Sequence, residues 1–284
     1  MELLKNGSYS GERALYHARD VVIEDAVFFD GESPLKEGKN LSVSRSSFRW
    51  MYPVWYCEHV KISDSVFDEH TRAGFWYCHD TEVGGCRFDS PKNFRRSTGL
   101  RLTDTVFTAG PETLWYCEDV RMKNIDVTGD YFCMNCENVT ASGLRLDGKY
   151  SFDGCRNLTL ENAVLHTKDA FWNCENVTVR NSVILGEYIG WNSKNLTFEH
   201  CRIESKQGLC YIDGLKMVDC ELPATDLCFE FCSDIDAELT TPVVSIKNPV
   251  SGKITLPSVG ELILEDGLID PEKTAIVFTD PSAH

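Results

Sequence analysis

Apolar and polar residues alternate in short segments along the chain, and these segments recur at a nearly constant interval. In segments such as CENVTV and SKNLTF an apolar residue follows directly after Asn, Asp or Gly, and we take this residue as the anchor of one repeat. Successive anchors are 19 to 21 residues apart: Val21, Leu41, Val60, Thr81, Leu100, Val120, Val139, Leu158, Val177, Leu196, Leu215 and Ile235. A fixed interval of this length indicates a repeat architecture.

Within each repeat, two further columns of residues are apolar. The first lies two residues after the anchor: Ile23, Val43, Ile62, Val83, Leu102, Met122, Leu160, Val179, Phe198 and Met217. The second lies seven residues after it, aromatic at first and then aliphatic: Phe28, Phe48, Phe67, Phe88, Phe107, Val127, Leu146, Leu165, Ile184, Ile203 and Leu222. A period of two is typical of β-strands, and no repeat contains a useful stretch of helical period. The pattern predicts an all-β, single-stranded parallel β-helix of about twelve coils, with the second column as a continuous inner stack.

The residue before the anchor is almost always one that tolerates a positive φ angle. The column reads Asp20, Asn40, His59, Asp80, Gly99, Asp119, Asn138, Asn157, Asn176, Asn195, Gly214 and Asp234. Asn, Asp and Gly are the residues that enter the left-handed region at least cost. We therefore expect a sharp left-handed turn at this point of every coil.

The repeat extends through most of the chain, so we expect one domain over residues 1–284. Residues 1–12 are expected to cap the first coil, because an open parallel edge invites aggregation. Residues 13–241 form the regular coils. Residues 242–284, where three prolines interrupt the pattern, are expected to form irregular final coils and a C-terminal cap.

The chain has thirteen cysteines, and seven of them lie three residues before an anchor: Cys57, Cys78, Cys117, Cys136, Cys155, Cys174 and Cys232. Mostly small residues replace Cys in the other repeats, which indicates small buried side chains stacked at a corner. In-register parallel strands aim their Cβ atoms the same way, which opposes disulfide geometry. The Cys133-x-x-Cys136 pair has no second pair or His beside it, so we expect no metal site. No cofactor is expected either.

Tryptophan occupies one column five residues before the anchor. It contains Tyr16, Lys36, Trp55, Trp76, Arg95, Trp115, Met134, Asp153, Trp172, Trp191, Cys210 and Glu230. The preceding column is nearly all apolar and is expected to point inward, so strand alternation turns the tryptophan column outward. An outward ladder of indoles suits the flat faces of sugar rings. We therefore expect Trp55, Trp76, Trp115, Trp172 and Trp191, with Lys36 at one end, to bind an extended oligosaccharide.

Other interpretations of this column remain open. The tryptophans would be equally well explained by packing under a terminal segment, or by an interface of a homo-oligomer. A slip of alternation near a coil corner would bury them and remove the binding site.

Charge excludes some classes of partner. Asp and Glu number 44 against 28 Lys and Arg, which gives a net charge of −16. Such a surface repels nucleic acids and anionic membranes, and it favours neutral glycans over polyuronates. The apolar runs are too short to cross a bilayer, and the first residues show no export signal, so we expect a cytoplasmic protein.

Several longer segments resemble a known family. GERALY, DGKYSFDG, TKDAFWNCENVTV, GEYIGWNSKNLTF and IKNPVSGKI resemble the bacterial domain-of-unknown-function family 3737, over Gly11 to about Ile254. More distantly, the chain is similar to the pectin-lyase-like superfamily of right-handed parallel β-helices, which implies right-handed coils. That superfamily contains polysaccharide lyases, glycoside hydrolases, esterases and phage tail proteins, whereas the closer family implies no assigned reaction.

The catalytic motifs of that superfamily are absent from the sequence, so no catalytic residue is carried over. The coil spacing leaves no room for long loops, and a shallow face excludes water poorly, which weakens catalysis. We therefore expect a protein that binds a carbohydrate-like ligand or a partner without conventional catalysis. A polysaccharide-active hydrolase or lyase using Asp153, Arg95 or Arg96 is the first alternative. An oligomerising scaffold is the second.

Overall fold

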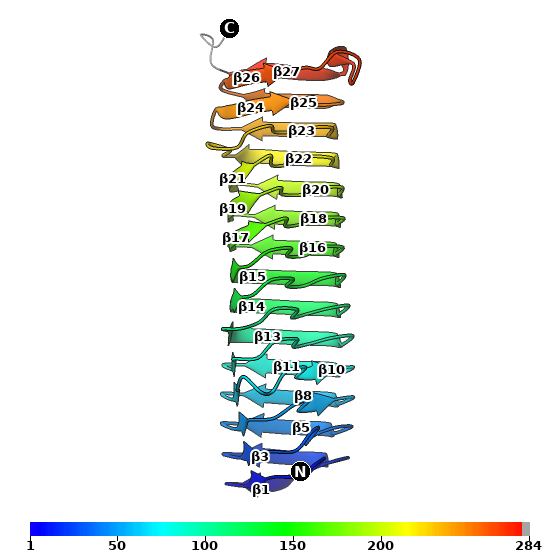
Figure 1. The fold of residues 1–284 in the computed structure, drawn as a ribbon, viewed down its shortest axis with the longest axis vertical. Helices are drawn as coiled ribbons and strands as arrows, with labels where there is room; N and C mark the ends of the chain where they lie inside the picture. Colours follow the sequence, from blue (N-terminus) through cyan, green and yellow to red (C-terminus); the bar gives the residue numbers. More distant parts are fainter. Residues whose placement is uncertain (280–284) are drawn as a thin grey trace. The chain divides into compact units, whose positions relative to one another are not determined.

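The computed structural model describes residues 1–279 and contains strands, turns and one short helix, η1 (Pro271–Lys273). The chain divides into two compact units, the first ending at Gly148 and the second beginning at Lys149. Each unit is a parallel β-solenoid, in which the chain winds in coils and each coil pairs with the next (Figure 1). The predicted all-β parallel β-helix is therefore confirmed.

The first unit contains fifteen strands, most of them short. They are β1 (Glu2–Lys5), β2 (Ser8–Tyr9), β3 (Arg19–Glu24), β4 (Val27–Phe28), β5 (Lys39–Ser44), β6 (Ser47–Phe48), β7 (Val54–Trp55), β8 (Glu58–Ser63), β9 (Val66–Phe67), β10 (Phe75–Trp76), β11 (His79–Gly84), β12 (Arg87–Phe88), β13 (Thr98–Phe107), β14 (Glu118–Thr128) and β15 (Glu137–Asp147).

The anchors of the first unit stack in register. Strands β1, β3, β5, β8, β11, β13, β14 and β15 pair in this order, all in parallel. Leu41 lies opposite Val60, and Val60 lies opposite Thr81, as the repeat predicts. Figure 1 shows these strands as successive rungs coloured from blue to green. Every rung thus places the same repeat position above its equivalent in the next.

The second unit follows the same plan. Its strands are β16 (Arg156–Glu161), β17 (Val164–Lys168), β18 (Glu175–Arg180), β19 (Val183–Glu187), β20 (Lys194–Glu199), β21 (Arg202–Lys206), β22 (Asp213–Cys220), β23 (Ser233–Leu239), β24 (Val243–Lys247), β25 (Gly252–Leu256), β26 (Val259–Ile263) and β27 (Thr274–Phe278). The anchor row runs through β16, β18, β20, β22, β23, β25 and β27. A second row is formed by β17, β19 and β21, and β24 pairs with β26.

The number of coils is higher than the sequence indicated. We expected about twelve, and the two units together contain about fifteen turns. One additional rung precedes Val21, where Glu2 occupies the anchor position, and two follow Ile235, where Gly252 and Thr274 do. These anchors are polar or lack a side chain, so the apolar signature that identified the other coils is missing there.

The ends of the chain continue the coil pattern. Residues 1–12, expected as a cap, contain β1 and β2, which pair in register with β3 and β4. Residues 242–279 contain four further strands and η1, while the remaining residues of the expected C-terminal cap lie outside the described part. The expectation of a single domain over residues 1–284 stays a prediction.

The core of each unit is the predicted inner stack. In the first unit, the rings of Phe28, Phe48, Phe67, Phe88 and Phe107 stack with centroids 4.3 to 4.8 Å apart. In the second unit, the same position holds buried aliphatic residues, among them Leu165, Ile184 and Ile203. Stacked rings in a water-free interior add directional contact energy to the area they bury.

The predicted left-handed turn is confirmed at all twelve positions, where φ lies between 51° and 77°. The asparagines of this column also bond to one another. Asn176 Nδ2 donates to Asn157 Oδ1 at 3.1 Å, and Asn195 Nδ2 donates to Asn176 Oδ1 at 3.0 Å. The column therefore favours Asn for two reasons: its tolerance of positive φ and its ability to donate and accept at the same time.

Replacing Asn176 separates these two contributions. Asn176→Gly removes the side-chain bonds and keeps the backbone conformation, whereas Asn176→Ala removes the bonds and strains the backbone. We expect Asn176→Ala to have a free energy of unfolding about 1 kcal/mol lower than Asn176→Gly. Urea unfolding of both variants measures this difference. Equal stabilities would show that the left-handed turn does not select the residue.

Candidate functional site

Aromatic residues of the first unit stack along one edge of the coils. β7 and β10 pair in register, and single bridges continue the row through Arg95 and Trp115. The indoles of Trp55 and Trp76 are stacked with centroids 5.0 Å apart and planes 6° apart. The Arg95 guanidinium lies between the next two indoles, 4.7 Å from the ring of Trp76 and 4.5 Å from that of Trp115. We call these four residues the inner ladder.

The inner ladder is half-buried rather than fully outward. One face of the Trp76 indole is covered by Trp55 and the other by Arg95. The prediction that indole faces would be presented to sugar rings is therefore not met at Trp76, because in-register stacking turns ring faces toward neighbouring coils. The edges of the stacked rings face the solvent.

The indole N–H groups of the first unit form hydrogen bonds that connect each coil to the next. Trp55 Nε1 donates to the carbonyl of Ala73 at 2.7 Å, Trp76 Nε1 to Lys92 at 3.0 Å, and Trp115 Nε1 to Tyr131 at 2.7 Å. Each accepting residue has a positive φ angle and lies at the same repeat position of the following coil. A turn that bends away from the sheet leaves its carbonyl without a ladder partner, and the indole supplies one.

The side chain of Arg95 is held in place by contacts with its neighbours. Besides the two indoles, it forms an ion pair with Glu112 through Nη2 at 3.2 Å, and Lys92 lies 3.4 Å from the same carboxylate. Its Nε is buried and has no hydrogen-bond partner among the described residues. A guanidinium held between two rings and a carboxylate is a poor candidate for the catalytic base considered from the sequence.

A second row runs beside the inner ladder. It consists of Tyr56, Tyr77, Arg96 and Tyr116, which lie four residues before their anchors, together with Lys36 from the tryptophan column, and we call it the outer ladder. Tyr56, Arg96 and Tyr116 are exposed, whereas Lys36 and Tyr77 are half-buried. The rings of Tyr56 and Tyr77 stack 4.8 Å apart. Lys36 Nζ lies 5.6 Å from the ring centroid of Tyr56, and the Arg96 guanidinium lies 4.9 Å from that of Tyr116. Tyr56 and Tyr116 are 47% and 49% exposed.

The outer ladder was only partly recognised from the sequence. Lys36 and Arg96 were singled out, but the tyrosines were not assigned a role. The signal that would have found them is their own column, four residues before the anchor, which carries Tyr in three of the coils of this unit. Tyr56, Tyr77 and Tyr116 all have φ between 54° and 58°. They form a second column of left-handed residues, which the sequence does not reveal because Tyr seldom adopts a positive φ.

The second unit contains the other two predicted tryptophans. Trp172 and Trp191 stack 5.6 Å apart, and Trp172 Nε1 donates to the carbonyl of Tyr188 at 3.0 Å. Trp191 Nε1 is buried without a partner among the described residues. Further along the column, Glu230 is 5% exposed and forms an ion pair with Lys247 at 2.9 Å. The column therefore changes from stacked rings to a buried ion pair.

Asp153, the remaining catalytic candidate, also lies in the second unit. Its Oδ1 accepts a hydrogen bond from Asn173 Nδ2 at 2.9 Å, and Asn173 Oδ1 accepts one from Asn192 at 2.8 Å. Asp169, in the same unit, is 3% exposed, and burial raises the pKa of its carboxyl group. Asp153 thus begins a ladder of side-chain amides, which is a structural arrangement.

All thirteen cysteines are buried and free. The predicted small, buried cysteine column is confirmed. Burial raises the pKa of Cys174 to about 12 and raises that of Cys232 further above the usual range of a thiol. Cys201 and Cys220 are coupled, because the hydrogen bond between their thiols lowers the pKa of Cys201 and raises that of Cys220.

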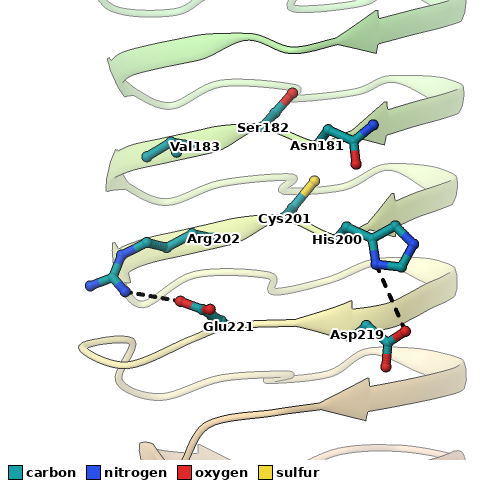
Figure 2. A pocket seen from close by; sticks show the side chains of 8 residues that line it. All are labelled: Asn181, Ser182, Val183, His200, Cys201, Arg202, Asp219 and Glu221. Atoms are coloured by element: carbon teal, nitrogen blue, oxygen red, sulfur yellow. Dashed lines mark hydrogen bonds and ion pairs between the residues drawn. The ribbon is translucent and has the colours of Figure 1, made fainter.

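Cys201 lies at a surface groove of the second unit, with a volume of about 350 Å³. Figure 2 shows Cys201 between His200 and Arg202, whose side chains extend to either side. One rung further on lie the carboxylates that pair with them. Arg202 Nη1 is 2.9 Å from Glu221, and His200 Nδ1 is 3.7 Å from Asp219.

Residues 1–279 contain neither a metal-binding cluster nor a membrane-spanning helix. No cluster of three or more His, Cys, Asp or Glu side chains in this part of the chain is arranged to hold a metal ion. No helix there is long and apolar enough to cross a membrane. The cytoplasmic location stays a prediction.

A comparison with known protein families identifies the family to which this chain belongs. The model of a family described as protein of unknown function (DUF3737) matches residues 2–277. The chain belongs to the DUF3737 family. The resemblance carried by the segments from GERALY to IKNPVSGKI is thus confirmed, and the match extends beyond them to residues 2–277 of the DUF3737 protein. Comparison of this DUF3737 protein with curated protein sequences gives no match.

Solved structures similar to this DUF3737 protein are β-helix proteins. PfbA, a surface adhesin of Streptococcus pneumoniae, is 10% identical, with 84% of each chain covered and a TM-score of 0.53. A tailspike protein of E. coli bacteriophage HK620, solved with a pentasaccharide, is 8% identical over 98% of this chain and 70% of its own, with a TM-score of 0.43. The A-module of the mannuronan C-5 epimerase AlgE4 of Azotobacter vinelandii is 9% identical over 99% and 90%, with a TM-score of 0.31. The adhesin supports a shared fold.

Removing one indole N–H tests the fastening role of the inner ladder in the DUF3737 protein. Trp115→Phe keeps an aromatic ring in the stack but leaves the Tyr131 carbonyl without its donor. We expect a loss of about 1–2 kcal/mol in the free energy of unfolding. The control Tyr116→Phe removes a hydroxyl from an exposed ring and is expected to change stability by less than about 0.5 kcal/mol. Equal effects in chemical unfolding would contradict this role.

Proposed function

We propose that this protein binds an extended, oligosaccharide-like ligand along the outer ladder of the first unit, without conventional catalysis. The observation that carries the proposal is a row of exposed and half-buried side chains that contact one another through their rings. Polar and aromatic groups recur in this row at the spacing of the coils, about 4.8 Å. A surface with a linear repeat fits a ligand that is itself linear and repetitive.

Pre-organisation favours binding at this row. Tyrosine contributes a large contact area with few rotatable bonds, so little entropy is lost when a ligand settles on it. The outer ladder rests against the inner ladder: the rings of Tyr56 and Trp55 lie 6.4 Å apart edge to face, as do those of Tyr77 and Trp76. Both rows are therefore fixed before the ligand arrives.

The mode of contact differs from the one expected from the sequence. Neighbouring side chains cover the ring faces of Trp76 and Tyr56, so a sugar would meet ring edges, phenol hydroxyls and cationic groups. Tyr hydroxyls donate and accept hydrogen bonds, and Arg and Lys donate them. This combination suits the many hydroxyl groups of a glycan. Lys36 and Arg96 form no ion pair with other described residues, so their donors are free for a ligand.

Two of the three groups considered for a hydrolase or lyase are engaged elsewhere, and the third, Arg96, belongs to the outer ladder. Arg95 is held by two indoles and Glu112, and Asp153 accepts from Asn173. Both arrangements support coil stacking and leave no free acid–base pair built from these residues. Binding without turnover is therefore the function that these contacts favour over the enzymatic alternative.

A homo-oligomer remains the second candidate, on one specific observation. Tyr, Trp and Arg are the residues most enriched at the energetic centres of protein interfaces, and all three types meet in the two ladders. A second copy of the chain would then take the place of the glycan. Mass measurement in solution separates the two functions.

Titration of the purified protein with a panel of neutral and acidic oligosaccharides tests the proposal. Calorimetry is expected to show saturable binding of one sugar class, and Tyr116→Ala is expected to weaken it about tenfold or more, equivalent to about 1.4 kcal/mol. Tyr211→Ala is the matched control, because Tyr211 occupies the same repeat position in the second unit and is 43% exposed. Its affinity is expected to equal that of the wild type.

Two outcomes would contradict the proposal. Absence of binding across the panel would remove the glycan function. A dimeric mass that Tyr116→Ala converts to a monomer would instead support the oligomeric scaffold.

A further inference from the structure

The two cationic side chains of the outer ladder are available to an anionic group. Lys36 is half-buried and Arg96 is exposed, and neither is paired with a described carboxylate. The carboxylate next to Lys36 in the chain, that of Glu37, pairs instead with His17 at 2.9 Å. Since acidic residues outnumber basic ones by 16 in this chain, two unneutralised cations in one row distinguish that row from the remaining surface.

The coils hold these two cations at a fixed separation. The backbone amides of Tyr56, Tyr77 and Arg96 each donate to a carbonyl of the following coil at 2.9 Å, so the row follows the coil spacing. Lys36 lies one coil before Tyr56. Three coils therefore separate Lys36 from Arg96, which is about 14 Å along the coil axis. Between the two cations lie two phenol groups, which are neutral and form hydrogen bonds as donors and acceptors.

We propose that the ligand of the outer ladder is a sparsely charged acidic glycan, in which two carboxylates about 14 Å apart bind to Lys36 and Arg96. This rests on the proposed glycan function and names the class of glycan. A guanidinium can bind a carboxylate through two parallel hydrogen bonds, and an ammonium binds it as a point charge. The neutral sugars between the two carboxylates place their hydroxyl groups against the phenols of Tyr56 and Tyr77.

Ionic screening separates this ligand from a polyuronate. The Debye length at physiological salt is about 8 Å, which is shorter than the distance between the two cations. Each carboxylate of a sparsely charged glycan therefore interacts mainly with its own cation. A polyuronate carries a carboxylate on every sugar, so it also places charges against Tyr56 and Tyr77, where no cation compensates them. Beyond Tyr116 it approaches Glu118 and Glu137, which lie opposite each other and repel it.

The test compares three oligosaccharides of equal length by calorimetry: one with a uronate at every third sugar, its carboxyl-reduced neutral form, and a homopolyuronate. The wild type is expected to bind the first about tenfold more tightly than the other two, the effect of one charge-assisted hydrogen bond. Arg96→Gln and Lys36→Gln are each expected to remove most of this preference and to leave the affinity for the neutral form nearly unchanged. Thermal unfolding of each variant confirms that the fold is kept.

Arg121→Gln is the matched control. Arg121 is an exposed cation of the first unit, in β14, where it lies opposite Arg101, and its substitution changes the net charge by the same amount. The control is expected to keep the full preference for the sparsely charged glycan.

Three results would overturn the proposal and leave the glycan function intact. They are equal binding of the acidic glycan and its reduced form, binding of the homopolyuronate at least as tight as that of the sparsely charged glycan, and loss of the preference in Arg121→Gln. Absence of binding to all three oligosaccharides would overturn the glycan function together with the proposal.

Discussion

Parallel pairing of each coil with the next, in register, is the constraint on which the other features of this structure depend. Each residue of a rung lies opposite its equivalent 16 to 22 residues away, as Val243 does with Val259 or Ile254 with Ile276. Side chains of one repeat position therefore form a column spaced at about 4.8 Å. A residue type is accepted in a column when it can stack on itself at that distance.

Each kind of column meets this condition through its own chemistry. Phenylalanine stacks ring on ring in the core, and asparagine donates and accepts along the turns. Arginine fits between indoles because its guanidinium is planar. Opposite charges meet at some charged positions, as where Glu82 lies within 3.6 Å of both Lys61 and Arg101. The alternation is not general, because Arg121 lies opposite Arg101 and Glu137 opposite Glu118. Exposed pairs of this kind contribute little individually.

The same spacing sets the chemistry of the candidate site in the first unit. It brings the rings of neighbouring coils into contact and covers both faces of the Trp76 indole. A ligand would therefore contact ring edges, hydroxyl groups and cationic groups.

The sequence by itself determined the coil, its register and its inward columns, because these depend on residue types that recur at a fixed interval. It also determined the left-handed turn before each anchor, since Asn, Asp and Gly are the residues that favour such a conformation. It missed the rungs anchored by Glu2, Gly252 and Thr274, whose residues carry no apolar signature. Tertiary structure alone decided how far the tryptophans are buried, which of their faces are covered, and where their N–H groups donate. Those properties depend on contacts between coils, and the polar or apolar character of a residue does not specify them.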